Sequence, residues 1–367
     1  MLTDSSPSAV TASPLSMVLQ TPAIHEFIAY LTEKKEQQER DPRQHLRFEV
    51  SRRFLNVVRT AFRQNILQGE RHLHYLAHFL SRRLFSGDFE LYSNVLGMLP
   101  DGNRPFLIRE RITDATLLSE TDIDLGNHLL ANFRYQSKQQ WVPLDLIANF
   151  IEYLPCGRLN TGVSRITSRV KAEEEIWNKV ADEIFNFDAL VNRDKHLRQF
   201  SKYIKDVFGV KLICDDVAAC VRVHDQLSAF RFRESDLQGL RADNGAATTP
   251  DDGNGKLEAL EFIETKDYLT CDPAQKKQTG WEALKSVVRW GPQLFEIQVQ
   301  PLVNYYLEID YMAAPSHRSF KQQRDALRDE VAQRVPLYGF YRDLLKMLFL
   351  EKDVAFQYDN ASVVVTE

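Results

Sequence analysis

The sequence predicts an α+β fold, in which an N-terminal helical domain precedes a mixed β-sheet flanked by helices. Three observations predict it. Helical periodicity dominates residues 22–100, short apolar runs alternate with helical stretches from about residue 160, and further helices close the chain. A chain of 367 residues is also long enough for two domains with apolar cores of their own.

The composition divides the chain into four parts. We expect a tail over residues 1–20, a mainly helical domain over 21–157, a second domain over 158–320, and closing helices with a tail over 321–367. The first residues are rich in Ser, Thr, Ala and Pro and lack the features of a signal peptide, so we expect disorder there. Residues 240–256 are polar, acidic and glycine-rich, which predicts a flexible loop.

Helices are expected through most of the first domain. Apolar residues lie on one helical face between Arg43 and Ile66, at Phe48, Leu55, Val58, Phe62 and Ile66. Gly69 interrupts this pattern, and a second helix is expected over residues 70–85. Short strands are expected near residues 106–109, and a further helix over residues 141–153.

Predicted strands and helices alternate along the second domain. Strands are expected over residues 208–214, 257–264, 284–290 and 294–299. Helices are expected over residues 171–185, 189–204, 216–227, 301–312, 320–335 and 337–350.

Charge and cysteine usage narrow the class of protein. A net charge of −5 gives no global attraction to nucleic acid or to a membrane surface. The four cysteines are scattered without a CxxC pair, which favours free thiols over a disulfide framework or a zinc site. No apolar run approaches the roughly 20 residues that a membrane span needs. We therefore expect a cytoplasmic protein without a membrane partner.

Three cations surround the predicted start of a helix. Arg169 precedes it, Lys171 opens it, and Lys179 follows eight residues after Lys171, close to the same helical face. A cationic face near a helix N-terminus can hold a triphosphate. A solvated basic face, balanced by the neighbouring glutamates, is the alternative.

Two carboxylates lie at predicted strand ends. Asp206 precedes the apolar run 208–214, and Glu296 begins an alternation that puts Glu296, Gln298 and Gln300 on one face of a strand. Paired carboxylates of this kind bind the magnesium ion that assists phosphoryl transfer. Taken singly, Asp206 is typical of a turn or cap residue, and the Glu296 strand is typical of a half-exposed edge.

A glycine turn lies between these carboxylates. Lys277 precedes it by three residues, and Gly280 is followed by Trp281, whose ring can stack on a nucleotide base. A surface loop with a packed tryptophan is the alternative.

The order of these segments resembles the RelA/SpoT family of alarmone synthetases. Its motifs correspond to Arg169-x-Lys171 with Lys179, Asp206 heading a strand, Val221-Arg-Val-His224, Asp267-Tyr-Leu269, Lys277-x-x-Gly-Trp281 and Glu296-Ile-Gln-Val299. Residues 312–321 loosely follow a further family motif. The resemblance covers residues 160–320, and several short motifs in the right order are more specific than any single one.

The resemblance implies a nucleotidyltransferase-like sheet and a magnesium-dependent transfer of pyrophosphate. The donor is ATP, the acceptor is the 3′-hydroxyl of GDP or GTP, and the product is (p)ppGpp, the alarmone of the stringent response. Asp206 and Glu296 would be catalytic and bind Mg²⁺. Arg169, Lys171, Lys179 and Lys211 would bind ATP, and Lys277, Trp281, Lys285 and Gln298 would bind the acceptor.

The chain departs from the family pattern at several positions. Lys211 replaces an arginine that stacks on adenine, Lys285 replaces a histidine, and Glu175 replaces a serine. The interval between Lys179 and Asp206 is also longer. Two alternatives therefore stay open: a degenerate domain that senses a nucleotide or partner, and a toxin-like relative that uses an adenosine nucleotide or a tRNA 3′ end. Homo-oligomerisation also stays open.

The N-terminal helices offer two further features. His72, His74 and His78 include an i, i+4 pair, for which the neighbouring sequence supplies no acidic third ligand, so we expect histidines that pack the helix. From Arg43 to Arg83 there are nine arginines and two glutamates. RNA contact is one interpretation of this excess, and solvated helix faces are the other.

Overall fold

The computed structural model describes residues 21–367, except residues 86, 100–104, 132, 134, 138–139, 143, 158–160, 172, 186–206, 233–257, 273–279, 292, 314, 351–357 and 359. The expected tail over residues 1–20, helix over residues 189–204 and loop over residues 240–256 lie outside the described residues. The chain divides into two compact units. The first comprises Met1–Asn65, Ala172–Lys205 and Ala326–Glu367, and the second comprises Ile66–Lys171 and Asp206–Asp325.

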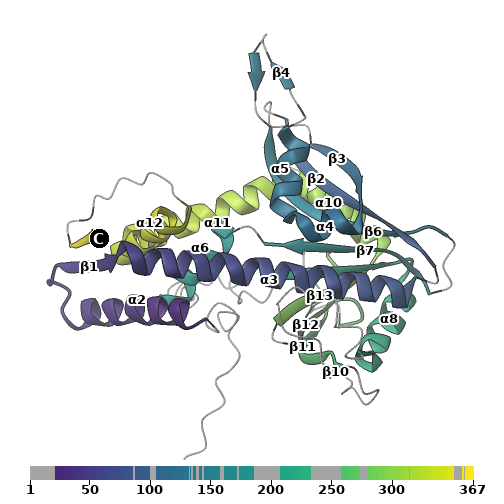
Figure 1. Ribbon diagram of the computed structural model, residues 1–367, viewed down its shortest axis with the longest axis horizontal. Coiled ribbons are helices and arrows are strands. Elements are labelled where there is room, and N and C mark those ends of the chain that lie inside the picture. The colour runs from purple at the N-terminus through teal and green to yellow at the C-terminus, as the bar shows by residue number, and fades with distance from the viewer. Residues whose placement is uncertain are drawn as a thin grey trace, which may run out of the picture. The chain divides into compact units, whose positions relative to one another are not determined.

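Helices form most of the first unit (Figure 1). They are α2 (Pro22–Arg40), the start of α3 (Arg52–Leu84), α6 (Glu173–Ile184), the end of α11 (Pro315–Arg334) and α12 (Pro336–Leu350). Two strands, β1 (Leu46–Ser51) and β14 (Ala361–Thr366), pair in parallel. Aromatic side chains fill the core: Trp177 stacks on Phe349 with ring centroids 3.7 Å apart, and Phe62 lies 4.6 Å from Trp177.

An eight-stranded mixed sheet forms the centre of the second unit, in the order β11-β12-β13-β8-β7-β6-β2-β3. These strands are β2 (Phe89–Met98), β3 (Pro105–Ile112), β6 (Asp145–Pro155), β7 (Val163–Val170), β8 (Phe208–Cys214), β11 (Glu261–Asp267), β12 (Leu284–Trp290) and β13 (Gln293–Pro301). β13 and β8 pair in parallel, and the other neighbours pair antiparallel.

Shorter elements complete the second unit. The helices are the end of α3, α4 (Asp114–Ser119), α5 (Asp122–Ala131), α8 (Val217–Ala229), α10 (Leu302–Ala313) and the start of α11. Two small hairpin sheets are formed by β4 (Tyr135–Ser137) with β5 (Gln140–Val142), and by β9 (Arg231–Phe232) with β10 (Glu258–Ala259). None of the helices in the described part of the chain carries an apolar stretch of membrane-spanning length.

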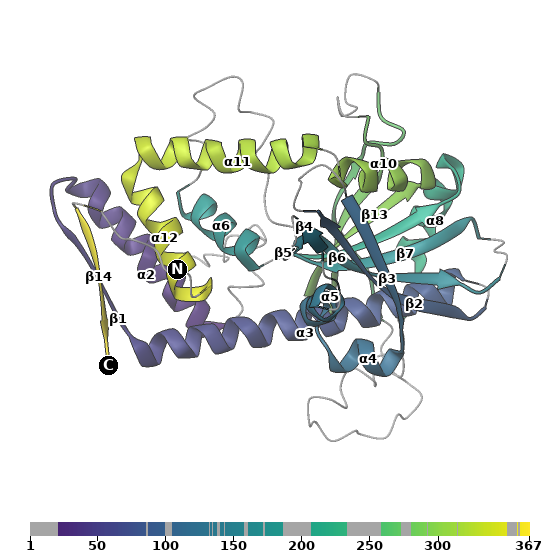
Figure 2. The same ribbon diagram turned by 90° about the horizontal axis from the view of Figure 1, so that it is seen from above.

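One face of the large sheet is apolar. Because side chains alternate along each strand, Phe208 and Val210 on β8 share this face with Phe295 and Ile297 on β13, and all four are buried. The end of α3 covers it, since a Cβ at Gly69 would meet the ring of Phe208. This half of α3 and α10 lie on opposite sides of the strands (Figure 2).

The other face is polar, and α10 lies over part of it. The pairing register puts Arg165, Thr167, Lys211, Gln298 and Lys285 on this second face of neighbouring strands. Contacts from α10 reach the same residues: Glu308 pairs with Lys211, and the Tyr306 hydroxyl lies 3.3 Å from Arg165. The fold therefore gathers charged side chains along one surface of the sheet.

The predictions for the second half of the chain are largely confirmed. Strands β8 and β12 have the predicted bounds, and β13 extends the predicted strand by one residue at its start and two at its end. Helices α6, α8, α10, α11 and α12 lie where helices were expected. Asp216 caps α8, because its carboxylate accepts a hydrogen bond from the backbone N–H of Ala219 at 2.7 Å.

Three predictions for the first half are wrong. The helix expected from Arg43 begins only at Arg52, after strand β1. Gly69 does not end a helix: α3 runs through it, because the missing side chain admits the Phe208 ring. The helix expected over residues 141–153 is strand instead, within β5 and β6. There Ile151 and Tyr153 face the apolar side while Glu152 faces the polar side, the alternation of a strand.

Candidate functional site

The candidate site lies on the polar face, where β7, β8 and β13 run side by side. Gly209 on β8 pairs with Glu296 on one side and with Arg169 on the other. A Cβ added at Gly209 would meet only the backbone oxygen of Arg169, at 3.9 Å, so the space above this glycine is open. A carboxylate and a guanidinium therefore flank a gap that no side chain of the described residues fills.

Glu296 is a buried carboxylate, with only 3% of the residue exposed. Lys285 on β12 approaches its Oε2, and the side-chain amide of Gln298 donates to its Oε1. The strand alternation predicted that Glu296 and Gln298 share a face, and they do. Three residues that the sequence predicted for the site, Glu296, Lys285 and Gln298, are therefore in contact.

Arg169 is exposed at the other side of the gap. Within the part of the chain that the structure describes, its guanidinium makes no ion pair. An exposed arginine with free donors is suited to bind a phosphate group, because the planar guanidinium offers paired N–H groups.

Lys211 and Gln298 pair across β8 and β13, two residues along from Glu296. The Lys211 ammonium lies 2.7 Å from Oε2 of Glu308 on α10. Glu308 also accepts hydrogen bonds from the Trp281 indole at 2.7 Å and from the Gln300 amide at 2.8 Å. One carboxylate thus ties together β8, β13, α10 and the segment that carries Trp281.

The electrostatics of Glu308 follow from these contacts. Burial alone would raise the pKa of this carboxyl, but the Lys211 ammonium and the hydrogen bonds from Gln300 and Trp281 outweigh burial and hold the pKa below its ordinary value. Sequence reasoning missed Glu308. The one available signal was its place six residues after Leu302, on the helix that directly follows the Glu296 strand.

The remaining predicted residues fall in different places. Trp281 is half-buried and lies 5.7 Å from the Tyr268 ring, next to Gly280, whose φ of +72° is the conformation that glycine tolerates. Lys171 follows β7, and its backbone N–H donates to the carbonyl of Val207. Lys179 lies on α6, in the first unit. Asp206 and Lys277 lie outside the described residues.

Glu296 is an oxygen ligand of the kind that Mg²⁺ prefers. In the present arrangement both of its oxygens face donors from Lys285 and Gln298, so a metal would exchange with the Lys285 ammonium at Oε2. The side chain of Lys285 is 29% exposed and can turn toward water. The described carboxylate is therefore compatible with Mg²⁺ once Lys285 moves.

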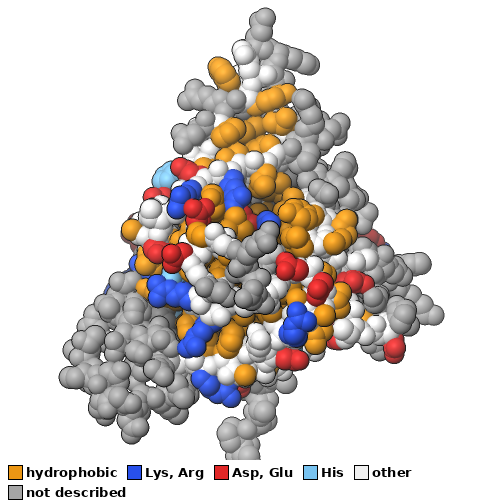
Figure 3. Space-filling view, turned by 90° about the vertical axis from the view of Figure 1, so that its right-hand side faces the viewer, with side chains coloured by type: hydrophobic (Ala, Val, Ile, Leu, Met, Phe, Trp, Pro, Cys, Tyr) orange, Lys and Arg blue, Asp and Glu red, His pale blue; other side chains and the backbone are white. Residues whose placement is uncertain are grey.

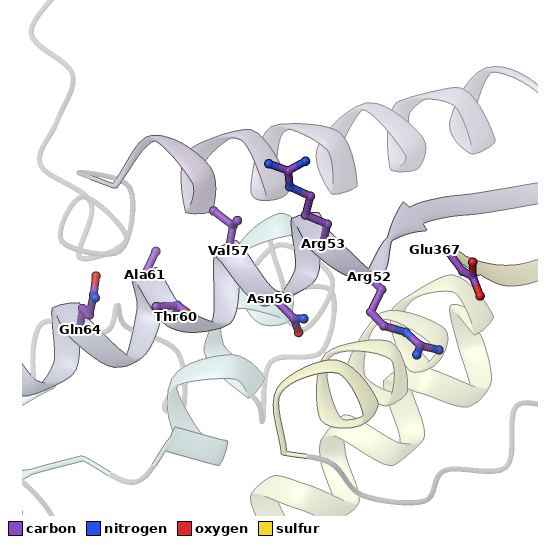
Figure 4. A pocket seen from close by; sticks show the side chains of 8 residues that line it. All are labelled: Arg52, Arg53, Asn56, Val57, Thr60, Ala61, Gln64 and Glu367. Atoms are coloured by element: carbon purple, nitrogen blue, oxygen red, sulfur yellow. The ribbon is translucent and has the colours of Figure 1, made fainter.

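A separate open hollow of about 760 Å³ lies in the first unit, along the start of α3 (Figure 4). Arg52, Arg53, Asn56 and Gln64 line it together with Glu367. Of the arginines proposed for RNA contact, Arg59 instead donates to the backbone carbonyl of Leu348 and is half-buried. Arg59 therefore packs the helix, whereas Arg52 and Arg53 are exposed.

Figure 3 shows the face at the right-hand side of Figure 1, whereas the start of α3 lies at the left there. On the face in Figure 3, Lys and Arg side chains are interspersed with Asp, Glu and apolar side chains. Nucleic-acid interfaces gather positive charge on one continuous surface. Among the described residues in this view, no such surface stands out.

Comparison with known proteins adds a loose likeness. No family model and no curated protein matches the chain. The solved structures that match include small alarmone synthetase 1 from Bacillus subtilis (TM-score 0.26, 16% identity, 52% of this chain and 77% of that chain). Small alarmone synthetase 2 from Bacillus subtilis (0.25, 18%, 53% and 83%) and a GTP pyrophosphokinase family protein from Streptococcus pneumoniae (0.26, 16%, 52% and 73%) also match. The match spans half of this chain and is too loose to transfer residues one by one.

Proposed function

We propose that the second unit is a nucleotide pyrophosphokinase that transfers pyrophosphate from ATP to the 3′-hydroxyl of a guanosine nucleotide. The observation that carries this proposal is the row Arg169–Gly209–Glu296 across three strands, with an open gap at the glycine. A phosphate-binding cation and a buried carboxylate on either side of a vacant position form the minimal arrangement for phosphoryl transfer. The sequence motifs contribute the choice of reaction.

In the proposed reaction the 3′-oxygen of the acceptor attacks the β-phosphorus of ATP. The bond from this phosphorus to the oxygen bridging to the α-phosphate breaks, and AMP leaves. Glu296 accepts the proton of the 3′-hydroxyl, and Arg169 binds phosphate oxygens beside the gap. Mg²⁺, held by Glu296 and Asp206, would neutralise the charge of the triphosphate.

The remaining predicted residues take supporting roles in this proposal. Lys171 and Lys211 bind the ATP phosphates and base. Lys277, Lys285 and Gln298 bind the acceptor, and Trp281 stacks on its base. Because Glu308 orients both Lys211 and Trp281, it would link the donor and acceptor sides.

The test is a product analysis with the full chain. Labelled ATP and Mg²⁺ are incubated with GDP, GTP, ADP, ATP or tRNA as acceptor, and the products are resolved by chromatography. We expect AMP and a pyrophosphorylated guanosine nucleotide. Glu296→Gln should lower the rate by about 10²–10⁴-fold, the range for losing a general base. The matched control is Glu261→Gln, a change at an exposed glutamate on β11 of the same sheet.

Gly209→Val tests the gap itself. Valine suits a β-strand, so the protein should fold, but its side chain would occupy the space between Arg169 and Glu296. We expect nucleotide binding and turnover to be lost together while the melting temperature stays within a few degrees. Full turnover in either Glu296→Gln or Gly209→Val would exclude the proposed site.

One observation favours a second candidate, a domain that binds nucleotide without turnover. Lys285 already pairs with Glu296 at the oxygen where a metal would bind. Under this alternative the protein binds ATP or GTP in equilibrium dialysis, Gly209→Val abolishes this binding, and no AMP forms with any acceptor.

A further inference from the structure

A second cluster of ionisable side chains lies away from the polar face. It consists of Glu70 and His74 on α3 and Asp122, the first residue of α5. Glu70 and His74 are four residues apart and so share one face of the helix. The Asn149 amide, on the apolar side of β6, donates to the backbone carbonyl of Asp122 at 2.5 Å. The cluster therefore lies on the side of the sheet opposite Glu296.

All three side chains are almost completely removed from water, with exposed fractions of 6% for Glu70, 2% for His74 and 2% for Asp122. Their ligand atoms lie within 4.8 Å of one another. Nε2 of His74 is 3.0 Å from Oδ1 of Asp122 and 3.8 Å from Oε1 of Glu70. Two ligands of a tetrahedral zinc ion, each about 2.1 Å from the metal, are about 3.4 Å apart. The two measured separations bracket this value.

The hydrogen bonding of Asp122 is incomplete. Within the described chain, neither of its carboxylate oxygens accepts a properly aligned hydrogen bond, although the side chain is buried. The His74 ring stands 3.0 Å away, but off the line of such a bond. A buried carboxylate normally has donors of its own, since desolvation without them is costly. The His74 nitrogen and the Asp122 oxygen are therefore placed so that both could bind one metal ion.

The charge balance points the same way. Two carboxylates and one imidazolium sum to one net negative charge in a buried place, which is costly. A divalent cation with a neutral histidine brings the sum to zero.

We propose that Glu70, His74 and Asp122 form a structural site for a divalent transition-metal ion of the zinc class, which fastens α5 to α3. One imidazole nitrogen with two carboxylate oxygens is a zinc-type ligand set, and a water would complete four-coordination. The site is independent of the pyrophosphokinase proposal, because its residues lie on the other side of the sheet and contact none of that site's residues.

The chain provides a matched control one turn further along α3. His78 also faces an aspartate: its Nε2 is 3.4 Å from Oδ1 of Asp114. That aspartate side chain is 65% exposed, so water can solvate the pair and no buried third ligand is present among the described residues. Zinc that depends on His74 and Asp122 but not on His78 would therefore identify the cluster.

The experiment measures metal content and stability of the full chain. Wild-type protein is equilibrated with Zn²⁺, dialysed, and analysed by plasma mass spectrometry. We expect about one zinc ion per chain, retained in His78→Ala and lost in Asp122→Asn and His74→Ala. A chelator should lower the melting temperature of wild type and His78→Ala by roughly 5–10 °C, reversed by added Zn²⁺. Asp122→Asn keeps the shape of the side chain, so the comparison survives if His74→Ala does not fold. Wild-type protein without zinc, or equal zinc in Asp122→Asn, would overturn the proposal.

Discussion

Glu308 offers the sharpest test of how the polar face is held together. Its carboxylate forms an ion pair with Lys211 at 2.7 Å. It also accepts hydrogen bonds from the Trp281 indole at 2.7 Å and from the Gln300 amide at 2.8 Å. The perturbation is Glu308→Ala, which removes the acceptor of all three donors at once. The matched control is Glu261→Ala, which breaks an ion pair of similar length, 2.9 Å to Arg289, between side chains that are 62% and 42% exposed.

The expected loss of stability in Glu308→Ala depends on how deeply each of the three donors is buried. The Gln300 side chain is fully buried, so losing its acceptor leaves an amide without water, at a cost of about 1–3 kcal/mol. Lys211 is 29% exposed and regains part of its hydration, which reduces its share to about 1 kcal/mol. With about 1 kcal/mol for the Trp281 hydrogen bond, the sum is about 3–5 kcal/mol. For a unit of this size that corresponds to a melting temperature about 10 °C lower. The exposed Glu261 pair should contribute less than about 1 kcal/mol.

The assay is thermal unfolding of both variants between pH 7 and pH 3.5. The pKa of Glu308 in the folded protein is lower than its ordinary value of 4.5. A lowered pKa stabilises the fold above the ordinary value, and this contribution is lost as the pH falls through the folded pKa. The deficit of Glu308→Ala should therefore be full at pH 7 and shrink below pH 4.5. Equal melting of the two variants at pH 7, or a deficit that does not change with pH, would refute this reasoning.

Two further predictions concern stability elsewhere in the chain. In the first unit, Arg328 is 1% exposed and its guanidinium lies 2.8 Å from Asp182, which also accepts a hydrogen bond from Tyr338. Asp182→Asn should destabilise by about 3–5 kcal/mol in urea unfolding, because it removes the negative charge that faces a buried guanidinium. If Asp182→Asn unfolds at the wild-type urea concentration, this pair is not a stabilising one. In the second unit, Gly69→Ala should destabilise by about 1–3 kcal/mol, although alanine normally favours a helix, because the new Cβ would meet the Phe208 ring. Gly209→Ala is its control, since the space there is open, and equal stabilities would contradict the packing argument.

The sequence predicted the strands of the second unit better than those of the first. Apolar runs such as residues 208–214 are short, bounded and rich in β-formers, so their character is local. Residues 141–153 also contain apolar positions, and their spacing fits either a helix or a strand. Residues 145–155 form strand β6 because they pair with β2. This pairing is between distant segments, so the local spacing of apolar residues does not predict it. Gly69 was misread for a related reason, since its partner Phe208 lies 139 positions further along the chain.

The residues of the candidate site could likewise be predicted only where the pattern is local. Alternation along one strand predicted that Glu296 and Gln298 share a face, and the contact between them confirms it. Glu308 could not be found by this means, because its three donors come from three separate segments. For the buried cluster, the expectation that the neighbouring sequence supplies no acidic ligand is wrong, because Glu70 lies four residues before His74 and 3.8 Å from its ring. Asp122 lies 48 positions after His74, so a local pattern could not predict it.

The two faces of the sheet depend on one register. Gly209 is opposite Glu296 only because β8 and β13 pair in parallel with Phe208 and Phe295 buried on the other side. A slip of β13 by one residue would turn Glu296 toward the apolar face and Phe295 toward the polar face. The burial of Phe295 on the apolar face therefore fixes the position of the carboxylate on the other face. A substitution that disturbs the packing of Phe208 on Gly69 should therefore also shift the position of Glu296. This effect would be indirect, because no side chain of α3 touches the candidate site among the described residues. The packing of one face thus supports the chemistry of the other.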